Sequence, residues 1–343
     1  MTVWLPDKGS GPFLTTAIAR QGGAWVGWYA GQVAFRWIGR LARMRDLTLS
    51  GSDALRRENH ENHDPQEFLP TDPLALQAMA DASVRRCNGT VLRNTNAQWD
   101  AFPSQEYWRD NYEEIHPEDQ EIVHRVSRFF HKAFNNRGRA RSAIDVGSGT
   151  NLYPALMMLP WAERILLTDH SASNVRWLQL RVAHRDDPWT WQPFWREVSD
   201  LEGYNRVADP RGQLRQACSE WPGHAGIEQL SVFDLPEARW QLGTMFFVAE
   251  SITEEPEEFR DAIKAFVGSL QPDSPFAAAF MAGSHGYPVA KTCYPAVPIT
   301  EAQVRERFEK LGVSELSVDL LKTTDRVRKG YKGMIVATGI VGS

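Results

Sequence analysis

The stretch that decides the fold is AIDVGSGT, residues 143–150, where a short apolar segment runs directly into two glycines. Residues 142–146 have the composition of a buried strand, and a helical pattern begins at about Tyr153. Glycines at such a junction let the backbone turn sharply and approach a ligand, because a Cβ there would fill the space. The stretch therefore predicts a strand, a tight turn and a helix, with a ligand crevice at the carboxyl end of the strand.

Strand and helix signals alternate along the chain on both sides of this unit. The expected strands are 142–146, 164–169, 244–249, 276–281, 316–321 and 332–340. The expected helices are 72–86, 118–134, one from about Tyr153, one after Asp169, 256–270 and 304–311. Strands that alternate with helices at this spacing form βαβ units. We therefore expect an α/β fold with a mostly parallel sheet that helices cover on both faces.

The two acids around the glycine turn indicate the kind of ligand. Asp169 ends the second expected strand, twenty residues after Gly149, where a carboxylate can accept hydrogen bonds from both hydroxyls of a ribose. A dinucleotide site would have a third glycine, but Leu152 stands three residues after Gly149. Asp145, just before the glycines, would repel a phosphate and suits a cation. The pattern predicts a ligand that carries a ribose but presents no pyrophosphate to the turn.

An acid, two glycines and a second acid at the next strand tip resemble the S-adenosylmethionine-dependent methyltransferases. Four ordered segments narrow the resemblance to the family of nicotinamide, phenylethanolamine and thioether (indolethylamine) N-methyltransferases. These segments are EYWRDNY (106–112), IDVGSG with a following tyrosine (144–153), TDHSASN (168–174) and WTWQP…LEG (189–203). His170 departs from the family's aromatic residue at that position. The resemblance covers about residues 104–339.

The resemblance implies a Rossmann-like class I fold with a seven-stranded sheet over residues 104–343. Residues 1–103 precede this domain, and we expect them to form a helical extension. It implies S-adenosyl-L-methionine as cofactor and S-adenosyl-L-homocysteine as product. Tyr107 and Tyr112 would close over the ligands and exclude water. The residues that it implies at the cofactor are Tyr107, Tyr112, Asp145, Gly147, Ser148, Gly149, Tyr153, Asp169, His170, Asn174, Ser231 and Val232.

One part of the cofactor site stays open at this point. The family has an Asp-Val pair beside the adenine, and the aligned pair here is Ser231-Val232. Either the serine replaces the acid, or the alignment shifts to Asp234.

The acceptor side rests on residues that follow two strands. Glu250 and His285 are the catalytic candidates, because either side chain could take a proton from an amine. Trp108 and Tyr287 join Tyr107, Glu250 and His285 as expected acceptor-binding residues. The alternatives are that Glu250 is an exposed strand-end acid and that His285 is a plain surface histidine. The acids that set known specificities in the family correspond here to Met281 and Ser284, so neither specificity transfers.

Composition excludes several other classes. The chain has 343 residues and a net charge of −5 without a basic cluster, so we expect no nucleic-acid partner. Its three cysteines are far apart, which indicates neither a disulfide framework nor a zinc knuckle and fits a reducing cytosol. The pair His60 and His63 lies in a polar stretch without a third ligand, so we expect no metal site.

Membrane attachment is not expected either. The N-terminus lacks the pattern of a secretory signal, and the uncharged stretch 21–35 is too short to cross a bilayer. Residues 33–44 form an amphipathic helix pattern, which we interpret as packing against the protein or a second subunit. We therefore expect a cytoplasmic protein whose extension, residues 1–103, serves as a lid or an oligomerisation arm.

Together these observations predict methyl transfer to the nitrogen of a small aromatic or heterocyclic amine. One alternative is methylation of a carbon on an indole-like ring, where aromatic walls would stabilise the cationic intermediate. Another is a cofactor-binding scaffold that has lost catalysis. The chain has 13 tryptophans, and Trp108 is the one that we expect in an aromatic cage around the acceptor.

Overall fold

The computed structural model describes residues 91–183, 189–219, 221, 226–290, 292–323 and 330–343. All of them belong to one compact unit, Leu69–Ser343. The expected helices at 33–44 and 72–86 and the pair His60 and His63 lie outside the described residues. None of the helices within the described ranges is long and apolar enough to span a membrane.

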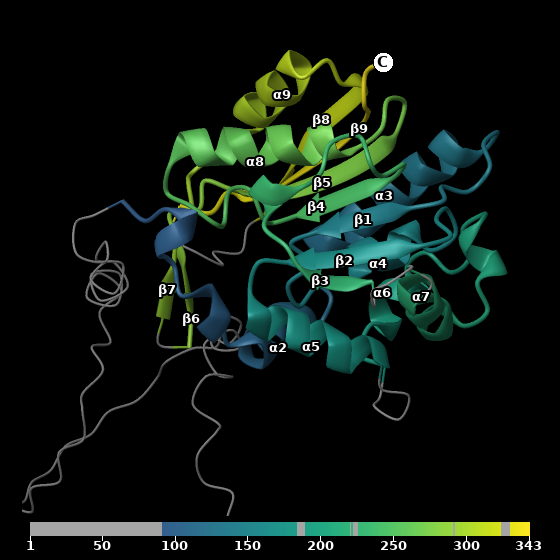
Figure 1. Cartoon of the computed structure of the whole chain (residues 1–343), viewed down its shortest axis with the longest axis horizontal. Helices are drawn as coiled ribbons and strands as arrows, with labels where there is room; N and C mark the ends of the chain where they lie inside the picture. The colour runs from purple at the N-terminus through teal and green to yellow at the C-terminus, as the bar shows by residue number, and fades with distance from the viewer. Residues whose placement is uncertain (1–90, 184–188, 220, 222–225, 291, 324–329) are drawn as a thin grey trace, which may run out of the picture. The chain divides into compact units, whose positions relative to one another are not determined.

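A seven-stranded sheet forms the centre of this unit, with the strand order β3-β2-β1-β4-β5-β9-β8 (Figure 1). Its strands are β1 (Ala143–Val146), β2 (Ile165–Asp169), β3 (Ile227–Gln229), β4 (Gly243–Phe246), β5 (Pro275–Ala282), β8 (Ser314–Lys322) and β9 (Gly333–Ile340). Neighbouring strands are parallel except that β9 runs antiparallel to both β5 and β8. The predicted seven-stranded, mostly parallel sheet is thus confirmed. A separate pair, β6 (Tyr287–Val289) and β7 (Thr292–Tyr294), follows β5.

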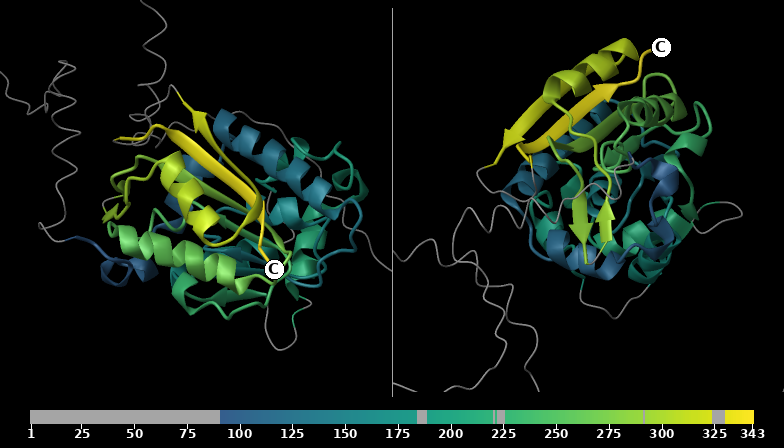
Figure 2. Two further views of the ribbon diagram at one scale, coloured as in Figure 1. Left: turned by 90° about the horizontal axis from the view of Figure 1, so that it is seen from above. Right: turned by 90° about the vertical axis from the view of Figure 1, so that its left-hand side faces the viewer.

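Helices pack on both faces of the sheet (Figure 2). They are α2 (Ser104–Tyr112), α3 (Pro117–Phe134), α4 (Tyr153–Met158), α5 (Ala172–Ala183), α6 (Gln192–Arg196), α7 (Pro210–Ser219), α8 (Pro256–Ser269) and α9 (Glu301–Lys310). Short 3₁₀ turns are η3 (Asn94–Asn96), η4 (Trp99–Ala101), η5 (Tyr204–Arg206) and η6 (Val232–Asp234). Helices α8 and α9 share one hydrophobic core with the sheet, and α3 to α7 share the other.

The central strands are buried on both faces, which explains their continuous apolar sequence. In β1, Ala143 faces the core beneath α3 and α4, whereas Ile144 and Val146 face the core beneath α8. Successive side chains point to opposite faces of a strand, so a buried strand needs small or apolar residues at every position. This is why residues 142–146 could be recognised as a strand.

Two details of the sheet differ from the sequence-based expectation. The strand expected at 244–249 ends at Phe246, because Phe247 adopts a left-handed conformation with φ of 60° and turns the chain away. The sequence analysis also missed β3, an edge strand in which only Ile227 is buried. A short strand with one buried residue lacks the apolar run on which recognition depends.

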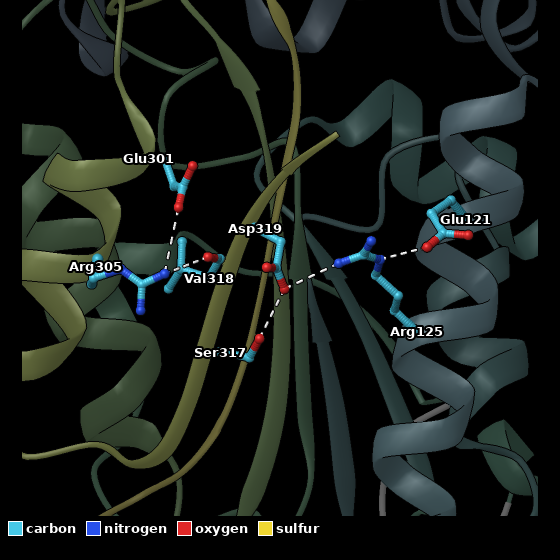
Figure 3. A network of polar contacts seen from close by, with 7 residues as sticks. All are labelled: Glu121, Arg125, Glu301, Arg305, Ser317, Val318 and Asp319. Atoms are coloured by element: carbon cyan, nitrogen blue, oxygen red, sulfur yellow. Dashed lines mark hydrogen bonds and ion pairs between the residues drawn. The ribbon is translucent and has the colours of Figure 1, made fainter. Parts of the chain in front are cut away.

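The opposite edge of the sheet is held between two helices by arginines (Figure 3). Arg125 of α3 forms an ion pair with Asp319 of β8, with 3.1 Å between nitrogen and oxygen. Arg305 of α9 donates a hydrogen bond to the backbone carbonyl of Val318 in the same strand. Both arginines are more than a third exposed, so we expect these contacts to add little to the stability of the folded protein. Their main effect is to orient α3 and α9 against β8.

Candidate active site

A cavity opens at the carboxyl ends of the parallel strands and holds about 770 Å³, counting the space at its mouth. Its walls come from the turn after β1, the end of β2, the start of α5, η6, the segment after β4, and α2. Figure 1 shows α2 beside α5, on the same side of the molecule as β6 and β7. Open α/β sheets bind ligands outside the carboxyl ends of their strands, which is where this cavity lies.

The turn after β1 favours glycine at two positions. Gly147 and Gly149 have φ of 65° and 55°, a region that residues with a Cβ rarely adopt. A Cβ on Gly147 would also lie 2.5 Å from Cγ2 of Val248. Glycine at position 147 therefore lets the turn pack closely against Val248, which also lines the cavity.

Asp169, at the end of β2, is fixed by three hydrogen bonds. The backbone amides of Gly149 and Ser171 donate to its carboxylate at 2.8 and 2.7 Å, and the Asn174 side-chain amide donates at 3.3 Å. Burial raises the pKa of Asp169, and the bonds from Ser171 and Asn174 oppose that rise. The carboxylate still lines the cavity, which leaves it able to accept hydrogen bonds from a bound hydroxyl.

These features fit S-adenosylmethionine. The glycine turn lines the cavity, and Asp169 presents an acceptor of the kind a ribose needs. Ser231 and Val232 also line the cavity, whereas Asp234 does not, so the geometry favours the serine of the two alternatives beside the adenine. Ser231 accepts a hydrogen bond from the Phe233 amide and thereby caps η6.

Most of the residues that the sequence marks for the cofactor are brought together on this surface. They are Tyr107, Tyr112, Gly147, Ser148, Gly149, Asp169, His170, Asn174, Ser231 and Val232. Tyr107 and Tyr112 both come from α2, and their ring centres lie 6.1 Å apart.

Asp145 and Tyr153 belong to the same region but lie behind the cavity wall. Oδ1 of Asp145 accepts a hydrogen bond from Thr244 at 2.7 Å, and burial raises the pKa of this carboxyl to about 7. The hydroxyl of Tyr153 donates to Asp119 at 2.9 Å, in the core between α3 and α4. Neither side chain lines the cavity.

The structure does not bring three of the expected acceptor residues to the cavity surface. Trp108 is buried on the far side of α2, where the guanidinium of Arg181 lies 6.0 Å from its ring centre. His285 is exposed in the turn after β5 and packs against Gly330. Glu250 is fully buried, one residue away from the cavity-lining Ser251. Of the expected acceptor residues, Tyr107 and Tyr287 do line the cavity.

Several lining residues were missed by the sequence analysis. Trp99 and Phe102 lie just before α2, in the segment assigned to the extension, and form a small aromatic cluster with Tyr287 and Tyr294. The hydroxyl of Ser173 donates to the Phe102 carbonyl at 2.9 Å, which holds this segment on α5. Aromatic residues next to the tyrosine-bearing motif were the available signal, but spacing alone does not show which rings reach the sheet edge.

Fold and site together define a class. A seven-stranded sheet with its last strand inserted antiparallel, and a glycine turn bonded to the acid of the next strand, are the framework of an S-adenosylmethionine-dependent methyltransferase. Within this class the chain belongs to the NNMT/PNMT/TEMT family, whose model matches residues 90–337.

Individual relatives are more distant. Human nicotinamide N-methyltransferase is 35% identical over 79 residues, which is 22% of this chain and 30% of that protein, so the matched segment spans less than a third of the relative. Among solved structures, the N-methyltransferase NodS of Bradyrhizobium japonicum with S-adenosylhomocysteine aligns at 11% identity and a TM-score of 0.40, over 72% of this chain and 96% of that one. Magnesium protoporphyrin IX methyltransferase of Synechocystis aligns at 13% identity and a TM-score of 0.41, over 73% and 99%.

Proposed function

We propose that this protein transfers a methyl group from S-adenosylmethionine to a nitrogen of a small aromatic or heterocyclic amine. The observation that carries the proposal is an aromatic wall beside the glycine turn. The ring centres of Phe102 and Tyr107 lie 5.2 Å apart, and those of Tyr107 and Tyr287 lie 6.1 Å apart. All three residues line the cavity, and such rings bind a flat acceptor and a developing cation.

When bound, the cofactor supplies a methyl group on a positively charged sulfur, which an acceptor nitrogen can displace in line. The protein's part is to hold the two reactants in that line, because orientation supplies most of the rate in such a transfer. The glycine turn and Asp169 hold the nucleoside end, and the aromatic wall orients the acceptor ring. Tyr107 and Tyr112 of α2 cover the cavity and keep water away from the reacting atoms.

A panel of acceptors tests this proposal directly. The purified protein is incubated with methyl-labelled S-adenosylmethionine and with arylalkylamines, pyridine-type heterocycles and indoles, and the methylated atom is located by NMR. We expect product labelled on nitrogen. A label on a ring carbon would favour the carbon-methylation alternative, and cofactor binding without turnover on any acceptor would favour the scaffold. Failure of the folded protein to bind cofactor would contradict the site assignment itself.

The wider roles also remain proposals. We propose that the protein acts in the cytoplasm on a small molecule, and that residues 1–103 provide a lid or an oligomerisation arm. Both follow from the sequence, and light scattering of the purified protein measures its oligomeric state. His285 as a proton acceptor is likewise a prediction, which an active His285→Ala variant would contradict.

A further inference from the structure

Ser251 connects the cavity to a buried carboxylate. It lines the cavity, and its hydroxyl donates a hydrogen bond to Oε1 of Glu250 at 3.1 Å. Glu250 has no exposed surface, and the same Oε1 accepts a hydrogen bond from the Met281 amide at 2.9 Å. An acceptor molecule in the cavity can therefore reach Glu250 only through a neighbouring group, and Ser251 is placed to be that group.

The backbone around this pair is held from both sides. The Phe247 amide donates to the Ala279 carbonyl of β5 at 2.7 Å, and the Val297 amide donates to the Glu250 carbonyl at 2.8 Å. The Tyr287 hydroxyl donates to the Ser251 carbonyl at 3.3 Å. Phe247 keeps its left-handed conformation within this frame. Unfavourable backbone conformations that neighbouring structure maintains are common at functional sites, where they fix side-chain positions.

We propose that Ser251 relays a proton from the ammonium group of an arylalkylamine acceptor to Glu250, which extends the proposed function and rests on it. The acceptor class follows from the chemistry of the relay. An aliphatic amine has a pKa near 10, so at pH 7.5 only about three molecules in a thousand carry the free electron pair that attack requires. A pyridine-type nitrogen has no proton to lose and gains nothing from such a relay.

The relay balances as follows. The N–H bond of the ammonium breaks and its electron pair stays on nitrogen, while the proton moves to Oγ of Ser251. The serine passes its original hydroxyl proton to Oε1 of Glu250, so the serine ends unchanged and the carboxylate becomes a carboxylic acid. A hydroxyl can do this because it is a donor and an acceptor at once. The free amine then takes the methyl group, and the carbon–sulfur bond breaks with its electrons going to sulfur. Once product has left, Glu250 returns the proton through Ser251 to water that enters the cavity.

Two acceptors and one variant test the proposal. The probes are 2-phenylethylamine, which must lose a proton, and quinoline, which has none on its nitrogen. At pH 7.5 we expect Ser251→Ala to lower kcat/KM for phenylethylamine by about tenfold or more and to leave quinoline within about twofold. The loss should shrink towards pH 9.5, because the free amine then arrives in larger amounts and needs no relay.

Further variants separate this role from a packing effect. Glu250→Gln should give the same acceptor-selective loss, and the double variant should lose no more than either single one, because the two groups act in sequence. Ser274→Ala is the matched control. It removes the hydroxyl of a buried serine that lies just before β5, far along the strand from Met281, and that donates a hydrogen bond to the Trp240 carbonyl. Calorimetry with S-adenosylhomocysteine should give equal affinities for the native protein, Ser251→Ala and Ser274→Ala.

Each remaining outcome is decisive. An equal loss on both acceptors, or none on phenylethylamine, overturns the relay and leaves nitrogen methylation standing. If the native protein methylates quinoline but not phenylethylamine, the relay is likewise overturned and nitrogen methylation still stands. If the native protein methylates only phenylethylamine, the pH dependence of the Ser251→Ala loss tests the relay. A loss that shrinks towards pH 9.5 supports the relay, and a loss that stays constant overturns it. If the native protein methylates neither probe nor any other amine in the panel, the proposed function fails and the relay fails with it.

Discussion

At the scale of single residues, the cofactor end of the cavity depends most on Asp169. Its carboxylate accepts three hydrogen bonds from the protein and faces the cavity. We expect Asp169→Ala to raise the Kd for S-adenosylhomocysteine about 10- to 100-fold, because hydrogen bonds to a charged group contribute about 1.5–3 kcal/mol. Calorimetry measures the Kd, and circular dichroism checks that the variant is folded.

Asp234 provides the matched control for that variant. It is also an acid near the carboxyl edge of the sheet, but it does not line the cavity. We expect Asp234→Ala to bind S-adenosylhomocysteine as the native protein does. Equal losses in both variants would show that the assignment of the ribose to Asp169 is wrong, and a loss in Asp234→Ala alone would move the adenine contact to that acid.

Asp119 makes stability depend on pH in an unusual direction. Burial raises its pKa from the ordinary value of 3.8 to about 7, and the hydrogen bond from Tyr153 only partly opposes this. Because the folded state binds the proton more tightly than the unfolded chain, this group lowers stability as pH rises from about 4 to about 7. Asp119→Asn removes the charge and keeps an oxygen for the Tyr153 hydroxyl.

We therefore expect the stability advantage of Asp119→Asn over the native protein to grow by about 2 kcal/mol between pH 5.5 and pH 8. Urea unfolding at the two pH values measures it. A difference that is the same at both values would show that Asp119 ionises in the folded protein as it does in the unfolded chain.

The sequence predicts residues whose roles are local to the backbone better than residues whose roles depend on contacts with distant segments. Gly147, Gly149 and Asp169 were predictable because a turn without Cβ atoms and an acid at the next strand end are local requirements of the backbone. Trp99 and Ser251 were not, because their roles arise from contacts with segments far along the chain. We expected Trp108 to line the acceptor pocket, but its position on α2 directs the side chain towards Arg181.

At the scale of elements, the contact between α2 and α5 joins the cover of the cavity to its floor. The hydroxyl of Ser104, the first residue of α2, donates to Oδ1 of Asn174 at 2.7 Å. Asn174 in turn donates to Asp169 at 3.3 Å. We expect Ser104→Ala to raise the KM for S-adenosylmethionine about two- to tenfold with little change in kcat, as befits the loss of one buried hydrogen bond.

A second residue of α2 serves as the comparison. Gln105 accepts hydrogen bonds from Trp177 and Arg181 of α5, so its loss loosens the same helix pair without touching Asn174. Steady-state kinetics of Gln105→Ala should show a smaller change in the KM for the cofactor. If the two variants change KM equally, α2 acts only by packing and the chain of hydrogen bonds to Asp169 transmits nothing.

The elements differ in how far sequence predicts them. Strands β1, β2 and β5 were expected within a residue or two, because each is buried at every position and so carries a continuous apolar run. The long helix α3 was found from the spacing of its buried residues. Strand β3 was missed and β4 was drawn three residues too long, since an edge position and one left-handed residue leave little trace in the sequence.

At the scale of the whole molecule, the described core and cavity are assembled from residues after 90. Among the described residues, those that line the cavity lie between Asn94 and Tyr287, and the family match begins at residue 90. Leu92 exchanges hydrogen bonds with Glu254, through that residue's backbone amide and its carboxylate, and the Asn94 amide donates to Glu258, so the segment before η4 is tied to the region where α8 begins. The methyltransferase unit therefore extends further towards the N-terminus than the tyrosine-bearing motif.

This arrangement predicts different outcomes for two truncations. Removal of residues 1–89 should leave the Kd for S-adenosylhomocysteine within about threefold, because the described hydrogen bonds and cavity residues all remain. Removal of residues 1–103 also deletes Trp99 and Phe102, so it should lose acceptor methylation and unfold at a lower temperature. Calorimetry, thermal unfolding and light scattering compare both with the full chain. A shift to smaller species on removal of residues 1–89 would support an oligomerisation arm, whereas loss of cofactor binding in that same chain would show that residues 1–89 complete the site.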